Sequence, residues 1–120
     1  MKYKNFGEFL REKRIESGIS LRNLAKRLNI SPAFLSDVEN DHRNPFELKR
    51  LLLLSDILLL NKDDSNKMFD LAGEKRHSIP PDVEEYIMEN EFLIPVLRDL
   101  HDAEVTKDDM DTFLSHLRKR

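Results

Sequence analysis

Histidines and adjacent acidic residues are the side chains best suited to catalysis or metal binding in this 120-residue sequence. The histidines are His42, His77, His101 and His116. They share no i, i+4 pair and no ligand spacing, so they predict no metal site. Glu84–Glu85 and Asp108–Asp109 are neighbours that point to different sides of a helix, which prevents each pair from acting as a paired acid and base. We expect no enzymatic activity, no cofactor and no metal.

A second group of chemically useful residues lies between Gly18 and Pro45, where the pattern predicts two short helices joined by a tight turn. Ser20 is placed to cap the first helix. Its apolar residues follow the i, i+3, i+4, i+7 spacing of a buried face. They are Leu21, Leu24, Ala25 and Leu28. Asn29 tolerates a left-handed backbone and therefore ends this helix at little cost.

The second helix is predicted over residues 32–40, with Ser31 as N-cap and Pro32 at the first helical position. It buries Leu35 and Val38. Two helices joined by so short a turn form a helix-turn-helix, whose second helix can enter the major groove of DNA. The start of this helix offers N–H groups and partial positive charge to a phosphate, and Ser31 adds a hydroxyl.

Short motifs of small, apolar and polar residues follow one another in fixed order between Gly18 and Pro45. They are Gly18-Ile19-Ser20, Leu24-Ala25, Ile30-Ser31, Leu35-Ser36, Val38-Glu39-Asn40 and Asn44-Pro45. With these motifs, the run from about Phe6 to Leu58 resembles the lambda-repressor-like (Cro/CI or Xre-type) helix-turn-helix family. The resemblance implies an all-α fold, with a five-helix DNA-binding module. About three short helices would follow as a C-terminal extension.

The resemblance also implies roles for individual residues. The base-facing residues would be Pro32, Ala33, Phe34, Ser36 and Asp37. The phosphate contacts would come from Arg22, Ser31, Asn40 and Arg43. Arg14 and Glu39 would form an internal salt bridge between the first helix and the recognition helix. The partners implied are double-stranded DNA and a second copy of the chain.

Three residues of the predicted helix-turn-helix are unusual for a surface that binds DNA. Leu21 stands where members of the family often carry glutamine. The Asp37 carboxylate suits a cytosine amino group but repels phosphate. Phe34 could contact a thymine methyl group, or it could be an aromatic residue of the core or of a protein interface.

The rest of the chain also predicts helices. Residues from Asn5 to about Ser17 form the first, ended by Gly18. A fourth helix spans Phe46 to about Leu59, with one side formed by Leu51, Leu52, Ser55, Leu58 and Leu59. Asn61 caps a fifth, which Gly73 ends. Ile79-Pro80-Pro81 interrupts the helical pattern, so we place a domain boundary near residue 76, between a module of residues 1–76 and an extension of residues 77–120.

The sequence of the extension predicts three helices. They span Asp82–Asn90, Phe92 to about Ala103, and the stretch from the capping motif at Thr106 to the C-terminus. The last helix carries an apolar stripe at i, i+3, i+4, i+7 spacing, which we expect to form a dimer or partner interface. It consists of Met110, Phe113, Leu114 and Leu117. Alternatively, the stripe folds back onto residues 82–103 of its own chain.

Charge is distributed unevenly along the sequence. Residues 1–50 contain eleven Lys/Arg and seven Asp/Glu, a net charge of +4, whereas residues 51–120 carry −7. This asymmetry favours a basic module that meets phosphate and an acidic one that does not. The sequence contains no cysteine and no apolar run of the ~20 residues that a membrane span needs. We expect a soluble, cytoplasmic protein.

The pattern as a whole predicts a sequence-specific DNA-binding transcriptional regulator, a repressor that binds a palindromic operator as a dimer. A second interpretation is an antitoxin that binds a toxin through its C-terminal segment and regulates its own operon. The third is an interaction scaffold without DNA binding, suggested by Leu21 and Asp37.

Overall fold

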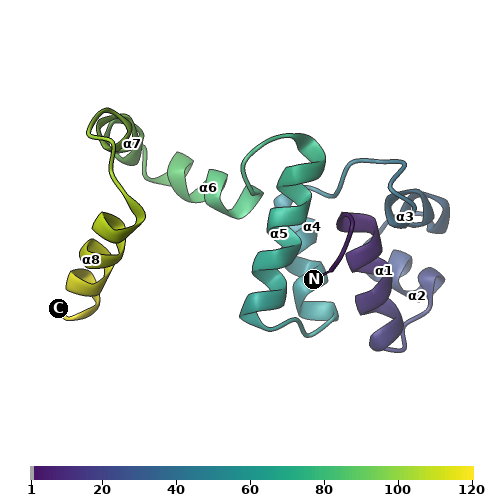
Figure 1. Ribbon diagram of the computed structural model, residues 1–120. Helices are drawn as coiled ribbons and strands as arrows, with labels where there is room; N and C mark the ends of the chain where they lie inside the picture. Colours follow the sequence, from purple (N-terminus) through teal and green to yellow (C-terminus); the bar gives the residue numbers. More distant parts are fainter. Residues whose placement is uncertain (1) are drawn as a thin grey trace. The chain divides into compact units, whose positions relative to one another are not determined.

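The computed structural model describes residues 2–120, and these form eight α-helices and no strand, which confirms the predicted all-α class (Figure 1). The first five helices are α1 (Phe6–Glu16), α2 (Leu21–Arg27), α3 (Pro32–Glu39), α4 (Leu48–Ile57) and α5 (Lys62–Arg76). The last three are α6 (Pro81–Glu89), α7 (Leu93–Asp102) and α8 (Lys107–Arg118). The chain divides into two compact units, a first unit that ends at Glu85 and a second unit from Tyr86 to Arg120.

All four N-caps that the sequence predicts are present. The Ser20 and Ser31 hydroxyls accept the backbone N–H of Asn23 and Phe34, both at 3.0 Å. Asn61 accepts the N–H of Asp64 at 2.7 Å. Thr106 and Asp109 form a reciprocal capping box at the start of α8. Each cap satisfies an N–H group that the helix itself leaves without a partner.

Helices also end where a residue can adopt a left-handed backbone. Gly18 has φ of 70° and Asn29 has φ of 58°, which confirms both predicted ends. Four further left-handed residues follow α3, α4, α5 and α7 without the help of glycine. They are Asp41, Leu59, His77 and Glu104. This backbone lets the last N–H groups reach back to free carbonyls of the preceding turn.

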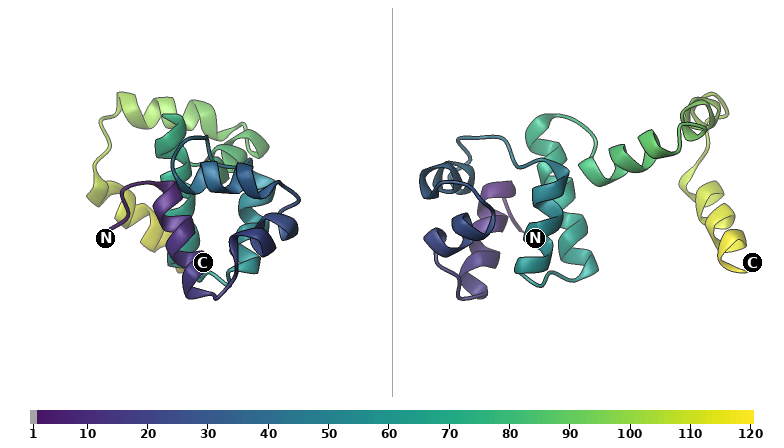
Figure 2. Two further views of the ribbon diagram at one scale, coloured as in Figure 1. Left: turned by 90° about the vertical axis from the view of Figure 1, so that its right-hand side faces the viewer. Right: turned by 180° about the vertical axis from the view of Figure 1, so that it is seen from behind.

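The core of the first unit lies around α1. This helix packs against both α3 and α5, α2 packs against α3, and α4 packs against α5 (Figures 1 and 2). The buried apolar side chains are Phe6, Phe9, Leu10, Leu24, Ala25, Leu28, Leu35, Val38, Phe46, Leu51, Leu54, Leu58, Met68, Phe69, Leu71 and Ala72. This cluster includes the predicted stripes of α2 and α3, except that Leu21 is only partly buried.

The residues that the sequence places along one side of α4 are buried only in part. Leu51 and Leu58 are buried, but Leu52 is half exposed, and Leu54, outside that set, lies fully in the core. Leu59 stands beyond the helix end with a left-handed backbone and is 88% exposed. Consecutive leucines fit several helix faces equally well, so the packing of α4 against α5 selects the one that is buried.

Gly73 does not end α5, which continues to Arg76 and is closed by the left-handed His77. The glycine instead permits a close approach. A Cβ atom there would lie 2.9 Å from both Pro80 N and Ser78 O, so any side chain would displace this connection. Pro81, at the start of α6, is also buried. The first unit therefore extends beyond the connection near residue 76 and includes the beginning of α6.

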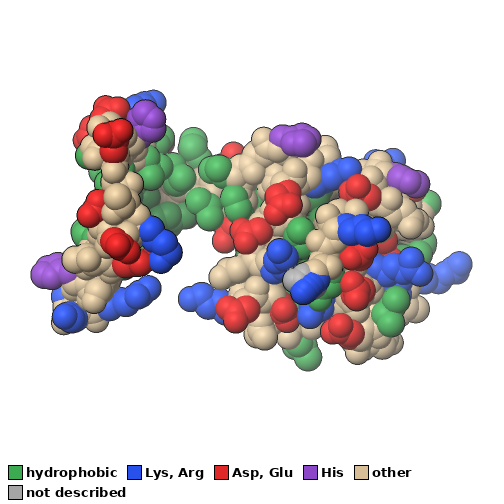
Figure 3. Space-filling model, in the orientation of Figure 1, with side chains coloured by type: hydrophobic (Ala, Val, Ile, Leu, Met, Phe, Trp, Pro, Cys, Tyr) green, Lys and Arg blue, Asp and Glu red, His purple; other side chains and the backbone are tan. Residues whose placement is uncertain are grey.

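The helices of the second unit bury little. No residue of α7 or α8 is buried, although both carry apolar stripes. Hydrophobic side chains gather on the surface over α6 and α7 in Figure 3. The exposed ones include Tyr86, Met88, Phe92, Val96 and Leu97. None of the helices within residues 2–120 combines the length and apolar character required to cross a membrane.

Candidate nucleic-acid interface

The helix-turn-helix is formed by α2, the turn around Asn29, and α3. Leu35 and Val38 fix α3 in the core, so the opposite side of this helix faces solvent. Pro32 and Ala33 are exposed, and Ser36 and Asp37 are partly exposed. The structure thus places these four predicted base-facing residues on the accessible side of α3.

The N-terminus of α3 offers fewer donors than the sequence suggests. Pro32 has no N–H group, and the Phe34 N–H is donated to the Ser31 hydroxyl. Within the first three positions of the helix, the Ala33 N–H remains for an external acceptor. The Ser31 hydroxyl can still donate its own proton. A phosphate would therefore meet two local donors, supported by the helix dipole.

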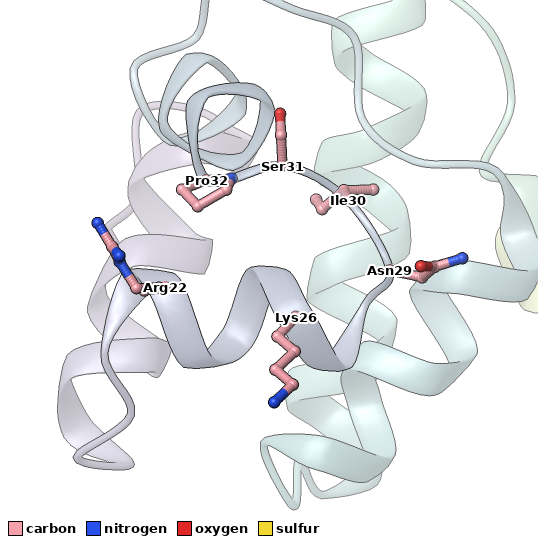
Figure 4. Close-up of a pocket in the computed structure, with 6 residues that line it drawn as sticks. All are labelled: Arg22, Lys26, Asn29, Ile30, Ser31 and Pro32. Atoms are coloured by element: carbon pink, nitrogen blue, oxygen red, sulfur yellow. The ribbon is translucent and has the colours of Figure 1, made fainter.

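An open hollow of about 460 Å³ lies beside this helix start (Figure 4). It is lined by Arg22, Lys26, Asn29, Ile30, Ser31 and Pro32. In Figure 4 Arg22 extends toward the side on which α3 begins, whereas Lys26 extends away from Ser31. Neither cation forms an ion pair with the residues that the structure describes. Both charges are therefore accessible to an anion.

Arg14 connects the first helix to the recognition helix. Its Nε donates to Glu39 Oε2 at 2.7 Å, and a terminal nitrogen donates to Glu39 Oε1 at 3.1 Å. The other terminal nitrogen donates to the Ile19 carbonyl at 3.0 Å. The hydrogen bond to Glu39 raises the pKa of Arg14 above its ordinary value. Both side chains are largely buried, so the pair holds α1, the loop before α2 and the end of α3 together.

A close helix contact accompanies this ion pair. Gly7 is buried in α1 against the C-terminal turn of α3. A Cβ atom on Gly7 would lie 2.5 Å from the backbone oxygens of both Val38 and Glu39. The absence of a side chain therefore sets how closely α1 approaches the recognition helix.

Phe34 has a packing role. Its ring is partly buried and stacks on Phe46, with ring centroids 6.2 Å apart. The Arg43 guanidinium carbon lies 4.5 Å from the centre of the Phe34 ring. Of the two interpretations left open by the sequence, this placement favours an aromatic at the edge of the core.

The chain reverses directly after α3. His42 N–H donates to the Asp37 carbonyl at 2.8 Å and Asp41 N–H donates to the Val38 carbonyl at 3.1 Å, which forms a Schellman motif. This reversal brings Arg43 back to α3, where its Nε lies 3.5 Å from Asp37 Oδ2. Asn40 Nδ2 lies 3.4 Å from Ser36 Oγ on the same helix.

Several residues that the sequence pattern did not single out support this surface. Arg50 donates to the Leu28 carbonyl at 2.9 Å and so caps the end of α2. Lys75 donates to the Asp41 carbonyl and pairs with its carboxylate, each at 3.1 Å. Arg76 donates to the carbonyls of Pro45 and Phe46. These cations are distant in sequence from their partners, so the sequence pattern could not reveal the contacts. The one local indication is that Lys75 and Arg76 lie in the last turn of α5, where basic residues are favourable.

The four residues predicted to form a dimer or partner interface lie together on α8. Phe113 and Leu114 are exposed, and Met110 and Leu117 are partly exposed. No three acidic or histidine residues within positions 2–120 gather closely enough to hold a metal ion.

An α2–turn–α3 unit fixed by α1, with the outer side of α3 open, defines a helix-turn-helix module. Residues 10–60 match the model of the helix-turn-helix family HTH_3. The match therefore covers the helix-turn-helix module and includes the motifs between Gly18 and Pro45. This match supports a function as a DNA-binding transcriptional regulator.

The chain is also similar to a solved chain from the complex of the SinR protein with the SinI protein. The two sequences are 22% identical over 96% of each chain, with a TM-score of 0.47. No curated protein sequence matches the chain.

Proposed function

We propose that this protein is a sequence-specific transcriptional repressor that inserts α3 into the major groove of DNA. The observation that supports this most directly is the accessible side of α3, which begins beside a hollow lined by the exposed cations Arg22 and Lys26. Neither of these cations forms an ion pair with any residue from 2 to 120. Pro32, Ala33, Ser36 and Asp37 would face bases. Arg22, Ser31, Asn40 and Arg43 would contact phosphates, and Lys26 would add a contact of the same kind.

We further propose that the repressor is a dimer. One recognition helix of eight residues reaches few base pairs, so two copies on a palindrome are needed for high specificity. In this arrangement residues 1–76 bind DNA and residues 77–120 join the two copies. The exposed stripe from Met110 to Leu117 is suited to this task because each apolar side chain gains about 1.5–3 kcal/mol on full burial.

Selection of bound sequences from a random DNA pool tests the proposal. The expected result is a palindromic consensus with half-sites about 34 Å apart, or a multiple of this spacing. Affinity for that consensus should fall steeply with added salt, because cations on the protein displace counterions from phosphates. Recovery of no consensus, together with no salt-dependent binding, would refute a DNA-binding function.

The second unit also fits a partner protein, which is the antitoxin interpretation. Residues 86–120 contain five Lys/Arg and eight Asp/Glu, a net charge of −3, beside the exposed apolar side chains of α7 and α8. Such a surface favours a basic partner with an apolar centre. Purification from the native cell distinguishes the two arrangements, since an antitoxin would copurify with a small basic protein.

A further inference from the structure

We propose that Arg43 and Asp37 act as one recognition unit, in which Arg43 neutralises and orients the Asp37 carboxylate that reads a base. This inference rests on the proposed DNA-binding function and goes beyond it. It assigns Arg43 a role in specificity rather than a phosphate contact alone. The family resemblance implied separate roles for the two residues, a base contact for Asp37 and a phosphate contact for Arg43.

Arg43 offsets the electrostatic repulsion that Asp37 would meet on DNA. Asp37 is the only acidic residue on the accessible side of α3, since Glu39 is buried with Arg14. A carboxylate can accept a hydrogen bond from a cytosine amino group in the major groove. It would do so between two phosphate backbones, which repel it. A guanidinium nitrogen 3.5 Å from Asp37 Oδ2 offsets that repulsion.

Arg43 is also held in place before DNA binds. The Schellman motif at Asp41 and His42 returns the chain toward α3. The guanidinium then lies against the Phe34 ring at 4.5 Å, and Phe34 itself stacks on Phe46. An arginine restrained by a ring and a carboxylate loses less conformational freedom on binding than one extended into solvent.

Arg43 also keeps hydrogen-bond donors free for DNA. Arg43 uses Nε toward Asp37, which leaves both terminal amino groups for a base edge or a phosphate. The two side chains are 52% and 47% exposed, so they remain accessible to DNA while paired. Phe34, Asp37 and Arg43 together thus form a preorganised edge of the recognition surface.

A double-mutant cycle on the full chain tests this unit. The variants are Arg43→Ala, Asp37→Ala and the double variant, measured on the selected consensus and on versions changed at each half-site position. Each single variant should lower discrimination at the same base position by about tenfold. The double variant should lower it no further, which gives a coupling of about tenfold.

Two controls make the cycle specific. Arg22→Ala removes an exposed cation that forms no pair with Asp37, so its effect should multiply with that of Asp37→Ala. Arg43→Lys keeps the charge but loses the planar group, so it should preserve the salt dependence and not the discrimination. Thermal melts should show every variant folded, because both pair residues are half exposed.

The outcomes separate this inference from the function on which it rests. If Arg43→Ala weakens all sequences equally and its effect multiplies with that of Asp37→Ala, Arg43 is an independent phosphate contact and the inference is wrong. If the unmodified chain binds no DNA, the proposed function is wrong, and the inference about Arg43 and Asp37 is wrong as well.

Discussion

The two units differ in what their apolar side chains contact. In the first unit, Phe9, Leu24 and Leu54 have no exposed surface, and their burial comes from α1–α5. In the second unit, α7 and α8 bury no residue, and Phe113 remains 51% exposed. Burial of apolar surface is the main source of folding free energy. The first unit therefore stabilises itself, and we propose that the second unit gains its burial from a second copy of the chain or from a partner protein.

The largest expected effect lies in the ion pair of the first unit. Glu39→Ala leaves Arg14 largely buried without its partner, which should lower the free energy of unfolding by about 3–5 kcal/mol. Urea denaturation measures this. As the control, Asp111→Ala breaks the exposed Lys107–Asp111 pair of α8 and should cost well under ~1 kcal/mol. If both variants lost similar amounts of unfolding free energy, the first unit would not depend on its buried ion pair more than the second depends on an exposed one.

Removing α8 tests the second unit directly. A chain that ends at Glu104 lacks the stripe from Met110 to Leu117, so it should sediment as a monomer. Its preference for a full palindrome over a half-site should fall by about a hundredfold, because the two recognition helices are no longer linked. The melting transition of the first unit should not change. A truncated chain that remains a dimer would exclude α8 from the interface.

A smaller effect is expected where α1 approaches α3. Gly7→Ala introduces a Cβ atom 2.5 Å from two backbone oxygens, and the displacement of α3 should cost about 1–3 kcal/mol. It should also weaken DNA binding, since α3 moves. Thermal denaturation and a DNA titration measure the two effects. Unchanged stability would mean that α1 and α3 adjust without strain, contrary to the tight packing of the first unit.

The smallest effect is a pH dependence in the second unit. Hydrogen bonds from the Thr106 N–H and side chain lower the pKa of Asp109 below its ordinary value. The capping box therefore contributes fully above the unfolded aspartate pKa of about 3.9, and its contribution is lost as pH falls through the lower folded value. Chemical shifts of Lys107 and Asp108 should report fraying of α8 in this range. Asp109→Asn should abolish that transition, and its persistence would assign the transition to another group.

Local chemistry determined much of this molecule. The caps at Ser20, Ser31, Asn61 and Thr106, and the ends at Gly18 and Asn29, follow from hydrogen-bonding groups and backbone preferences within a few residues. The buried stripes of α2 and α3 follow from helical periodicity, and the family motifs follow from fixed spacing. All of these are properties that a short segment has by itself, so the sequence was sufficient to predict them.

Tertiary structure decided what depends on partners distant in the chain. The buried side of α4 was not predictable from consecutive leucines, and Gly73 is required by the contact with Ser78 and Pro80 rather than by a helix end. Likewise, packing on Phe46 turned Phe34 toward the core, and the chain reversal after α3 placed Arg43 beside Asp37. Periodicity specifies that a residue lies on a face, but the neighbouring elements determine what that face meets.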